Sequence, residues 1–303
     1  MVSESNSKQR RKSLKQKIAI LYVLVAAGLW GSTGIYVRTL TGYGLTSMQI
    51  TTGKVVIGLV GAALFLLIKD KALFRIRIRD IGWFAANGIL IFFYGACYNA
   101  SIQMSGMAVA AILLYTSPIF VILLSIVIFK EKLSLIKSVS LVLAFIGCAL
   151  VSGIGISSTP IGFIALLLGL CSGFGYALYS IFSRILVKKY HSLTIVLYSS
   201  LFTALAAICL TDIQGIFAVC KEFHQAAGFY ILAGIFTNLV PNVLYINALL
   251  DIEAGKASML ASVELVMAAV LGFLVFHETL TMTAVTGIVC IVTMVILLGK
   301  DKN

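Results

Sequence analysis

Charged side chains are scarce in this sequence. Only 11% of the 303 residues are Asp, Glu, Lys or Arg, whereas 60% are hydrophobic and the mean hydropathy is +1.07. A water-soluble protein of this length needs a more polar surface, so we expect lipid to surround most of the chain. Acidic residues are the rarer charges, 11 against 23 basic ones, which gives a net charge of +12. A basic excess also occurs in nucleic-acid-binding proteins, so the positions of the charges decide its meaning.

The residues that usually mark disulfides, metal sites and catalytic centres are few and scattered. The six cysteines show no CxxC spacing and lie mostly in apolar runs, which predicts buried apolar side chains rather than disulfides or metal ligands. His277 and Glu278 begin a zinc-protease HExxH pattern, but Thr281 occupies the place of the second histidine. No phosphate-binding loop or nucleophile elbow occurs. We therefore expect no catalytic residue, no metal, no cofactor and no enzymatic activity.

Only three prolines occur, and long apolar runs fill most of the chain. A helix crosses the hydrocarbon core of a bilayer in about 20 residues. Runs of this length predict an all-α integral membrane protein with ten transmembrane helices, and the first run lacks the cleavage site of a signal peptide. The ten predicted spans are 18–37, 47–68, 81–102, 107–129, 134–154, 161–183, 194–211, 228–249, 254–276 and 281–299.

Lysine and arginine are distributed unevenly between the connections. If the N-terminus lies in the cytoplasm, 20 of the 23 basic residues fall in cytoplasmic segments, Arg38 and Lys221 fall outside, and Lys54 lies within a span. The positive-inside rule then predicts that both termini are cytoplasmic, in an inner or plasma membrane. The segment KQRRKSLKQK near the N-terminus resembles a nucleic-acid patch, but topology and lipid head groups account for it better. We therefore expect no nucleic-acid partner.

The two halves of the chain resemble each other. AAILLYTSPIFVILLSIVIFKEKLS at 110–134 aligns with ASMLASVELVMAAVLGFLVFHETLT at 257–281, so that Glu131 falls on Glu278. Each half holds five spans, an odd number, so the repeats must be inverted in the membrane, as in alternating-access carriers with a site at the midplane. The predicted organisation is a basic cytoplasmic tail at 1–17, repeats at 18–154 and 161–299, and a cytoplasmic C-terminus at 300–303.

Ten helices in two five-helix repeats resemble the drug/metabolite transporter superfamily, in its EamA-like branch. The residues that carry the resemblance are Trp30-Gly31-Ser32 followed by Arg38, Ser117-Pro118 followed by Glu131, and Glu264 followed by Glu278. The resemblance implies efflux or exchange of small metabolites. The second repeat of this family usually has Glu-Pro where this chain has Glu264-Leu265, so we expect the ninth span to lack the break that Pro118 gives the fourth.

Polar and aromatic residues recur along single faces of several predicted spans. In the third span, Tyr94 and Tyr98 share a face with Asn87 and Ser101, and the sixth and eighth spans carry similar stripes. Interhelical hydrogen bonds account for single residues, but matching stripes in both repeats favour a cavity inside the bundle. The residues that we expect to bind a small-molecule substrate are Trp30, Lys54, Tyr94, Tyr98, Asn99, Tyr115, Tyr176, Tyr179, Asn242, Tyr245, Asn247 and Glu264.

Two charges lie deep within the predicted spans. Glu264 is expected near the midplane, where burial favours the neutral carboxyl group and would suit proton exchange, although a static hydrogen-bonded glutamate is an equal alternative. Gly58 and Gly61 share the face of Lys54, which predicts that this lysine points into the bundle. We expect Lys54 and Glu264 to form an ion pair in the empty carrier. A zwitterionic substrate would replace this pair, with its carboxylate on Lys54 and its ammonium group on Glu264. A structural anchor is the rival role for Lys54.

Together these features predict a carrier for small polar or amphiphilic metabolites, with amino acids or related compounds first, that exports them by alternating access. A passive facilitator or channel and a cationic-drug efflux protein share the same features and stay open as alternatives. The fifth and tenth spans, 134–154 and 281–299, contain no acid, amide or aromatic hydroxyl group. We expect them to face lipid or a second copy of the chain in a homodimer.

Overall fold

The computed structural model describes residues 2–153 and 162–301, and within these residues the chain forms helices and connections without any strand. Helices suit apolar segments in lipid because a helix satisfies its backbone hydrogen bonds within one segment. The elements in chain order are α1 (Val2–Gly31), α2 (Thr33–Gly42), α3 (Ser47–Lys69), η1 (Lys71–Phe74), η2 (Ile78–Asp80), α4 (Ile81–Ser105), α5 (Met107–Leu114), α6 (Ser117–Phe129), α7 (Leu135–Val151), α8 (Phe163–Val187), α9 (Ser192–Ile208), α10 (Ile213–Glu222), α11 (His224–Ala233), the π-helical η3 (Gly234–Leu239), α12 (Val240–Ala248), α13 (Ala254–Ala261), α14 (Val263–Phe276) and α15 (Met282–Lys300).

Most of these helices have the length and composition of membrane spans. Within the described residues, eight helical segments are long and apolar enough to cross a membrane, and α9 with α10 makes a ninth if this bent pair is one span. α7 is apolar but has 17 residues. The predicted all-α membrane architecture is therefore confirmed, whereas the total of ten spans and the boundaries of the two repeats stay predictions.

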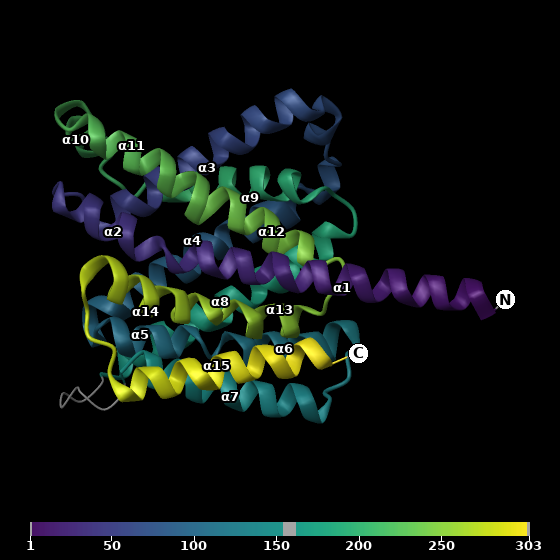
Figure 1. Ribbon diagram of the computed structural model, residues 1–303. Coiled ribbons are helices and arrows are strands. Elements are labelled where there is room, and N and C mark those ends of the chain that lie inside the picture. Colours follow the sequence, from purple (N-terminus) through teal and green to yellow (C-terminus); the bar gives the residue numbers. More distant parts are fainter. Residues whose placement is uncertain (1, 154–161, 302–303) are drawn as a thin grey trace.

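The helices run roughly side by side, and both ends of the described chain lie at the same end of the bundle (Figure 1). In that view α1 passes through the middle, with α3, α9 and α11 above it and α13, α14 and α15 below it. We call the end that holds the two termini the basic end, because the lysine- and arginine-rich connections 69–79, 130–137 and 184–189 lie there. The other end, which holds Arg38, Lys221 and Glu278, is the opposite end.

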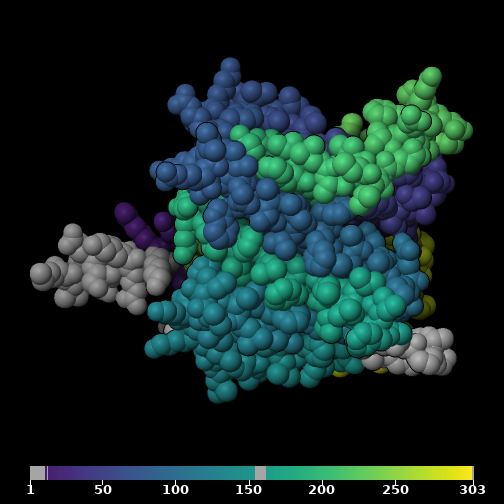
Figure 2. Space-filling model, turned by 180° about the vertical axis from the view of Figure 1, so that it is seen from behind, coloured from purple at the N-terminus to yellow at the C-terminus, as the bar shows by residue number. Residues whose placement is uncertain are grey.

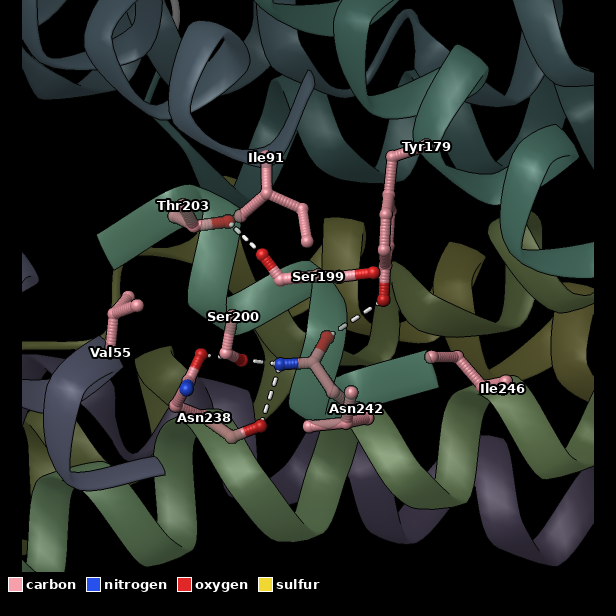
Figure 3. A pocket seen from close by; sticks show the side chains of 10 residues that line it. Val55, Ile91, Tyr179, Ser199, Ser200, Thr203, Asn238, Asn242 and Ile246 are labelled. Carbon is pink, nitrogen blue, oxygen red and sulfur yellow. Dashed lines mark hydrogen bonds between the residues drawn. The ribbon is translucent and has the colours of Figure 1, made fainter. Parts of the chain in front are cut away.

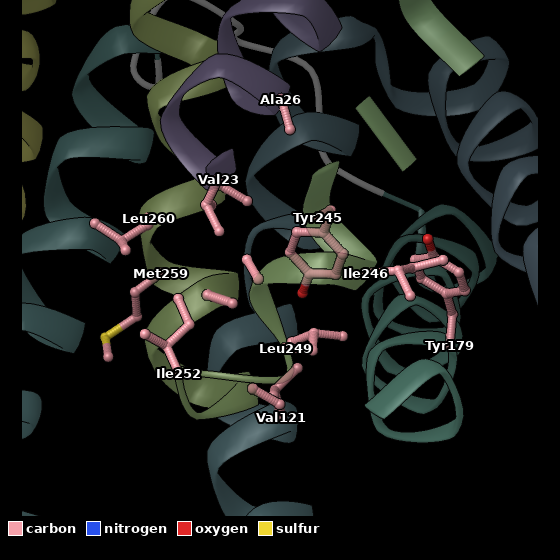
Figure 4. Close-up of a cluster of buried hydrophobic side chains, with 14 of the residues drawn as sticks. Val23, Ala26, Val121, Tyr179, Tyr245, Ile246, Leu249, Ile252, Met259 and Leu260 are labelled. Atoms are coloured by element: carbon pink, nitrogen blue, oxygen red, sulfur yellow. The ribbon is translucent and has the colours of Figure 1, made fainter. Parts of the chain in front are cut away.

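The largest core cluster lies where α1, α6, α12 and α13 meet (Figure 4). Val23 of α1, Tyr245 of α12 and Met259 of α13 are fully buried there, and Val121 of α6 packs with them. Viewed from behind, the green segment of α9 to α11 lies against the blue segment of α3 (Figure 2). The two halves of the sequence are therefore interleaved rather than set apart as separate domains.

Besides the bend between α9 and α10, three of the described spans are interrupted at a residue with a hydroxyl group. Ser32, Thr116 and Ser262 each donate a hydrogen bond to the carbonyl oxygen three residues earlier, at 2.7, 2.6 and 2.6 Å. Such a bond takes over a carbonyl group of the helix and favours a bend, and at Ser32 and Ser262 no proline is nearby. The expectation that the ninth span lacks a break is therefore wrong, because Ser262 replaces the missing proline. Pro118 sits just after the break in its span, in the first turn of α6, where a helix accepts proline.

The predicted fifth and tenth spans, α7 and α15, pack on each other through small residues. A Cβ atom placed on Gly147 would lie 2.9 Å from the carbonyl oxygen of Gly287, and one placed on Gly287 would lie 2.7 Å from that of Gly147. Each helix leaves an apolar face exposed, with Val142 on α7 and Val292 on α15. Whether lipid or a second copy of the chain covers this face stays a prediction.

Candidate functional site

A cluster of aromatic rings occupies the centre of the bundle. Tyr176 lies 5.6 Å from Tyr94, 5.9 Å from Tyr179 and 6.4 Å from Tyr245, measured between ring centroids. Trp30 adds a fifth ring at 5.5 Å from Tyr245. These separations are those of interacting aromatic pairs. The structure thus brings together five of the residues predicted from the sequence.

Four helices supply this aromatic cluster, two from each half of the sequence. Trp30 comes from α1 and Tyr94 from α4, whereas Tyr176 and Tyr179 come from α8 and Tyr245 from α12. Tyr176 and Tyr179 point the same way because residues three apart share one face of a helix. Tyr179 and Tyr245 are buried, and the other three rings are half-buried.

Of the two predicted charges, Glu264 lies beside this cluster. Glu264 lies in the first turn of α14, directly after the break at Ser262. The hydroxyl group of Tyr115, at the break between α5 and α6, lies beside the Glu264 carboxyl group, and Tyr98 is within its electrostatic reach. Lys54 is also within electrostatic reach of Glu264. Lys54 and Glu264 both belong to the described residues, and no direct ion pair joins their side chains. The expected pairing is therefore not formed in this structure.

A hydrogen-bonded chain extends from the aromatic cluster between α8, α9 and α12 (Figure 3). The Tyr179 hydroxyl group donates to the Asn242 side-chain oxygen at 2.8 Å, and the Asn242 amide donates to the Asn238 carbonyl oxygen at 2.6 Å. Ser199 and Ser200 of α9 face the same small void, which has room for about one water molecule. These hydrogen bonds therefore hold the side chains of Tyr179 and Asn242 in fixed orientations next to the aromatic rings.

Within the described residues, no ring contact or side-chain hydrogen bond links Asn99 or Asn247 to the cluster, and their part in substrate binding stays a prediction. Asn99 and Asn247 follow Tyr98 and Tyr245 by one and two positions, which turns their side chains by about 100° and 200° around the helix. Asn87 and Ser101 hold helices together instead: Asn87 donates to Ser199 at 2.9 Å, and Ser101 donates to the Ala165 carbonyl oxygen at 3.1 Å. The interhelical alternative therefore describes these two residues of the α4 stripe.

The sequence reasoning missed Ser180 and the serines of α9. The Ser180 hydroxyl group lies 2.9 Å from that of the buried Tyr245 and fixes its orientation. Its position four residues after Tyr176 was the available signal. Within residues 2–153 and 162–301, no group of three or more His, Cys, Asp or Glu side chains is arranged to hold a metal ion.

Each end of the bundle carries an arginine that pairs with a glutamate and lies over the ring of a phenylalanine. At the basic end, Arg184 pairs with Glu131 and lies 4.5 Å from the ring centroid of Phe129. At the opposite end, Arg38 pairs with Glu278 and lies 4.4 Å from that of Phe276. The glutamates and phenylalanines occupy equivalent places in the aligned halves, directly around Lys130 and His277, which both adopt the left-handed backbone conformation.

Helices that are apolar on their outer faces and surround a polar, aromatic centre define an integral membrane protein with a polar interior. A sequence profile of the EamA-like transporter family matches residues 17–153 and again residues 163–300. The chain therefore belongs to the EamA-like transporter family, and the resemblance to this branch of the drug/metabolite transporters is confirmed.

Similar proteins agree with this assignment. An uncharacterized transporter of Archaeoglobus fulgidus is 27% identical over 88% of this chain and 90% of its own. The uncharacterized inner membrane transporter YicL of Salmonella typhimurium is 27% identical over 94% of this chain and 96% of its own. A crystal structure superimposes with a TM-score of 0.77 at 15% identity, over 92% of this chain and 95% of that one, and supports the fold alone. The relatives are named as transporters, not as enzymes.

Proposed function

We propose that this transporter carries small zwitterionic metabolites, with amino acids or related compounds first, by alternating access and in the direction of export. A carboxylate would bind Lys54, an ammonium group would bind Glu264, and an apolar side chain would lie against the tyrosines. Several aromatic rings beside one carboxyl group suit an ammonium group, because the ring faces attract cations.

One observation carries this proposal: Glu264 lies beside an aromatic cluster built from both repeats, and Lys54 is close enough to Glu264 for their charges to interact. Lys54 and Glu264 lie within electrostatic reach of each other without a direct ion pair. An uncompensated charge in a span is costly, so a pair of opposite charges held apart in the bundle centre is typical of a binding site. A ligand with both charges would satisfy both groups at once.

The orientation is part of the proposal. The basic end would face the cytoplasm, because the positive-inside rule places lysine- and arginine-rich connections there, and the membrane would be the inner or plasma membrane. The name of the Salmonella relative as an inner membrane transporter supports this location. The exposed faces of α7 and α15 would contact lipid, or a second copy if the purified protein proves dimeric.

Organic cations are the second candidate substrates. Glu264 has Tyr98 and Tyr115 near it, and this half of the site would bind an amine without any help from Lys54. A passive facilitator would share the site, but it would show no accelerated exchange in counterflow.

The test is counterflow in liposomes that contain the purified protein, with and without a pH gradient. The panel holds neutral amino acids, the amines that lack their carboxyl group and the acids that lack their amino group. We expect the amino acids to be exchanged, and we expect Lys54→Gln and Glu264→Gln each to abolish exchange while the protein still inserts. Lys132→Gln, which changes an exposed lysine at the basic end, is the matched control. Transport of the amines alone, unchanged in Lys54→Gln, would overturn the zwitterion proposal in favour of organic cations.

A further inference from the structure

The two ends of the bundle are packed differently although the repeats are equivalent. α13 packs on α6 at the basic end, where a Cβ atom on Gly255 would lie 2.8 Å from Cγ1 of Ile122. All eight residues of α13 are buried. Its counterpart in the first repeat, α5, has three buried residues and, within these described helices, no comparable packing on α14. By burial and helix contacts, the basic end is therefore the more tightly packed of the two.

Two largely buried ion pairs bridge this more tightly packed end. Lys137 at the start of α7 pairs with Glu253, which directly precedes α13, and their side chains are 4% and 24% exposed. Arg184 at the end of α8 pairs with Glu131 after α6, at 14% and 12% exposure. Each pair joins a residue of the first half of the sequence to a residue of the second half. Separation of the halves at this end would have to break both pairs.

The opposite end has no equivalent of the Lys137–Glu253 pair. The aligned halves are offset by 147 residues, the separation between Glu131 and Glu278, so Lys137 corresponds to Ala284 and Glu253 to Gly106. The Arg38–Glu278 pair at that end is 53% and 49% exposed. Exposed ion pairs contribute little, whereas the loss of one partner from a buried pair leaves an uncompensated charge. The charges therefore favour closure at the basic end only.

We propose that Lys137–Glu253 and Arg184–Glu131 form a gate that holds the basic end shut, and that the structure is the state open toward the opposite end. The inference rests on alternating access, which belongs to the proposed function. When the basic end opens, water reaches all four charges, so the pairs are no longer needed to compensate them. The gate thus has a stable closed form and a solvated open form.

Hydrogen–deuterium exchange in lipid nanodiscs tests the gate with the full chain. The variants are Lys137→Gln, Glu253→Gln and the charge exchange Lys137→Glu with Glu253→Lys. Lys132→Gln, which removes an exposed lysine from the same connection, is the matched control. In both single variants we expect the amide hydrogens of α13 to exchange at least about tenfold faster and those of α5 and α14 to exchange more slowly, because opening one end closes the other. The charge exchange should restore the wild-type pattern.

The slower exchange at the opposite end separates a gate from a structural ion pair. Faster exchange at the basic end alone, or throughout the protein, would overturn the gate, and so would a charge exchange that restores nothing. Counterflow is measured on the same variants. If the opposite end showed no slower amide exchange and transport were intact, the gate would be refuted and the proposed function would stand. Reciprocal changes with no transported compound would support the gate and count against the proposed function.

Discussion

Gly31 sets the distance between α1 and α14, next to the proposed site. A Cβ atom at this position would lie 2.6 Å from Cβ of Met267 and 2.7 Å from the carbonyl oxygen of Glu264. Neither atom can rotate away, because one is backbone and the other is the first atom of its side chain. We therefore expect Gly31→Ala to push α14 outward and to move Glu264 with it.

The size of this effect follows from two opposing contributions. Overpacking of a well-packed contact costs about 1–3 kcal/mol. Replacing glycine by alanine in a helix contributes about 0.5–1 kcal/mol of stability. Gly34 in α2 is the matched control, because a Cβ atom there would meet nothing within 4 Å. Gly31→Ala should therefore be about 1–3 kcal/mol less stable than Gly34→Ala, since the helix contribution is common to both.

Reversible unfolding by titration with SDS, in one detergent, measures the free energy of unfolding of the two variants and the wild type. Counterflow with the best substrate of the panel should show weaker apparent affinity for Gly31→Ala alone. If Gly31→Ala were as stable as Gly34→Ala, or more stable, the close contact between α1 and α14 would not exist in the membrane-embedded protein.

Three further outcomes are expected. Gly287→Ala should be about 1–3 kcal/mol less stable than Gly299→Ala in SDS titration, because only the first meets the facing helix α7; equal stabilities would contradict this packing. Tyr179→Phe should lose about 0.6 kcal/mol, and at most about 1.7, with its hydrogen bond to Asn242, and a larger loss would mean a wider network. Burial, and then the charge of Lys69, lower the pKa of His191, whose Nδ1 caps α9. Protonation removes this acceptor, so the thermal midpoint should fall as the pH drops below about 6.5, through the lowered pKa, and the cap-retaining His191→Asn should lack that fall.

The architecture was predictable because its determinants are local. Apolar runs of about 20 residues predict spans whatever they pack against, and the same runs appear as α3, α4 and α8 with nearly the predicted bounds. The break at Ser262 was not predicted because serine bends a helix only when its hydroxyl group donates to the preceding turn, a choice that depends on neighbouring helices. A proline, by contrast, predicts a break from the sequence alone, because its ring lacks the backbone N–H group.

The candidate site was predictable where several residues share a helical face. Tyr176 and Tyr179 entered the list through their spacing, and the structure brings both rings to Tyr94. Asn99 and Asn247 occupy matching places in YNA at 98–100 and INA at 246–248, and their role stays a prediction. The buried pair of Lys137 and Glu253 escaped notice because the two residues are 116 positions apart and only the tertiary structure joins them.

Two of the three hydroxyl-bonded breaks have a consequence for the mechanics of the bundle. A proline kink is permanent, because the ring removes a backbone donor and a straight helix would cost about 3 kcal/mol or more. The curvature at Ser32 and Ser262, where no proline is near, depends instead on single hydrogen bonds, and a hydrogen bond within a membrane contributes about 0.6 kcal/mol, close to thermal energy. The free energy that holds these bends is therefore small, and a contact of similar size would be enough to offset it.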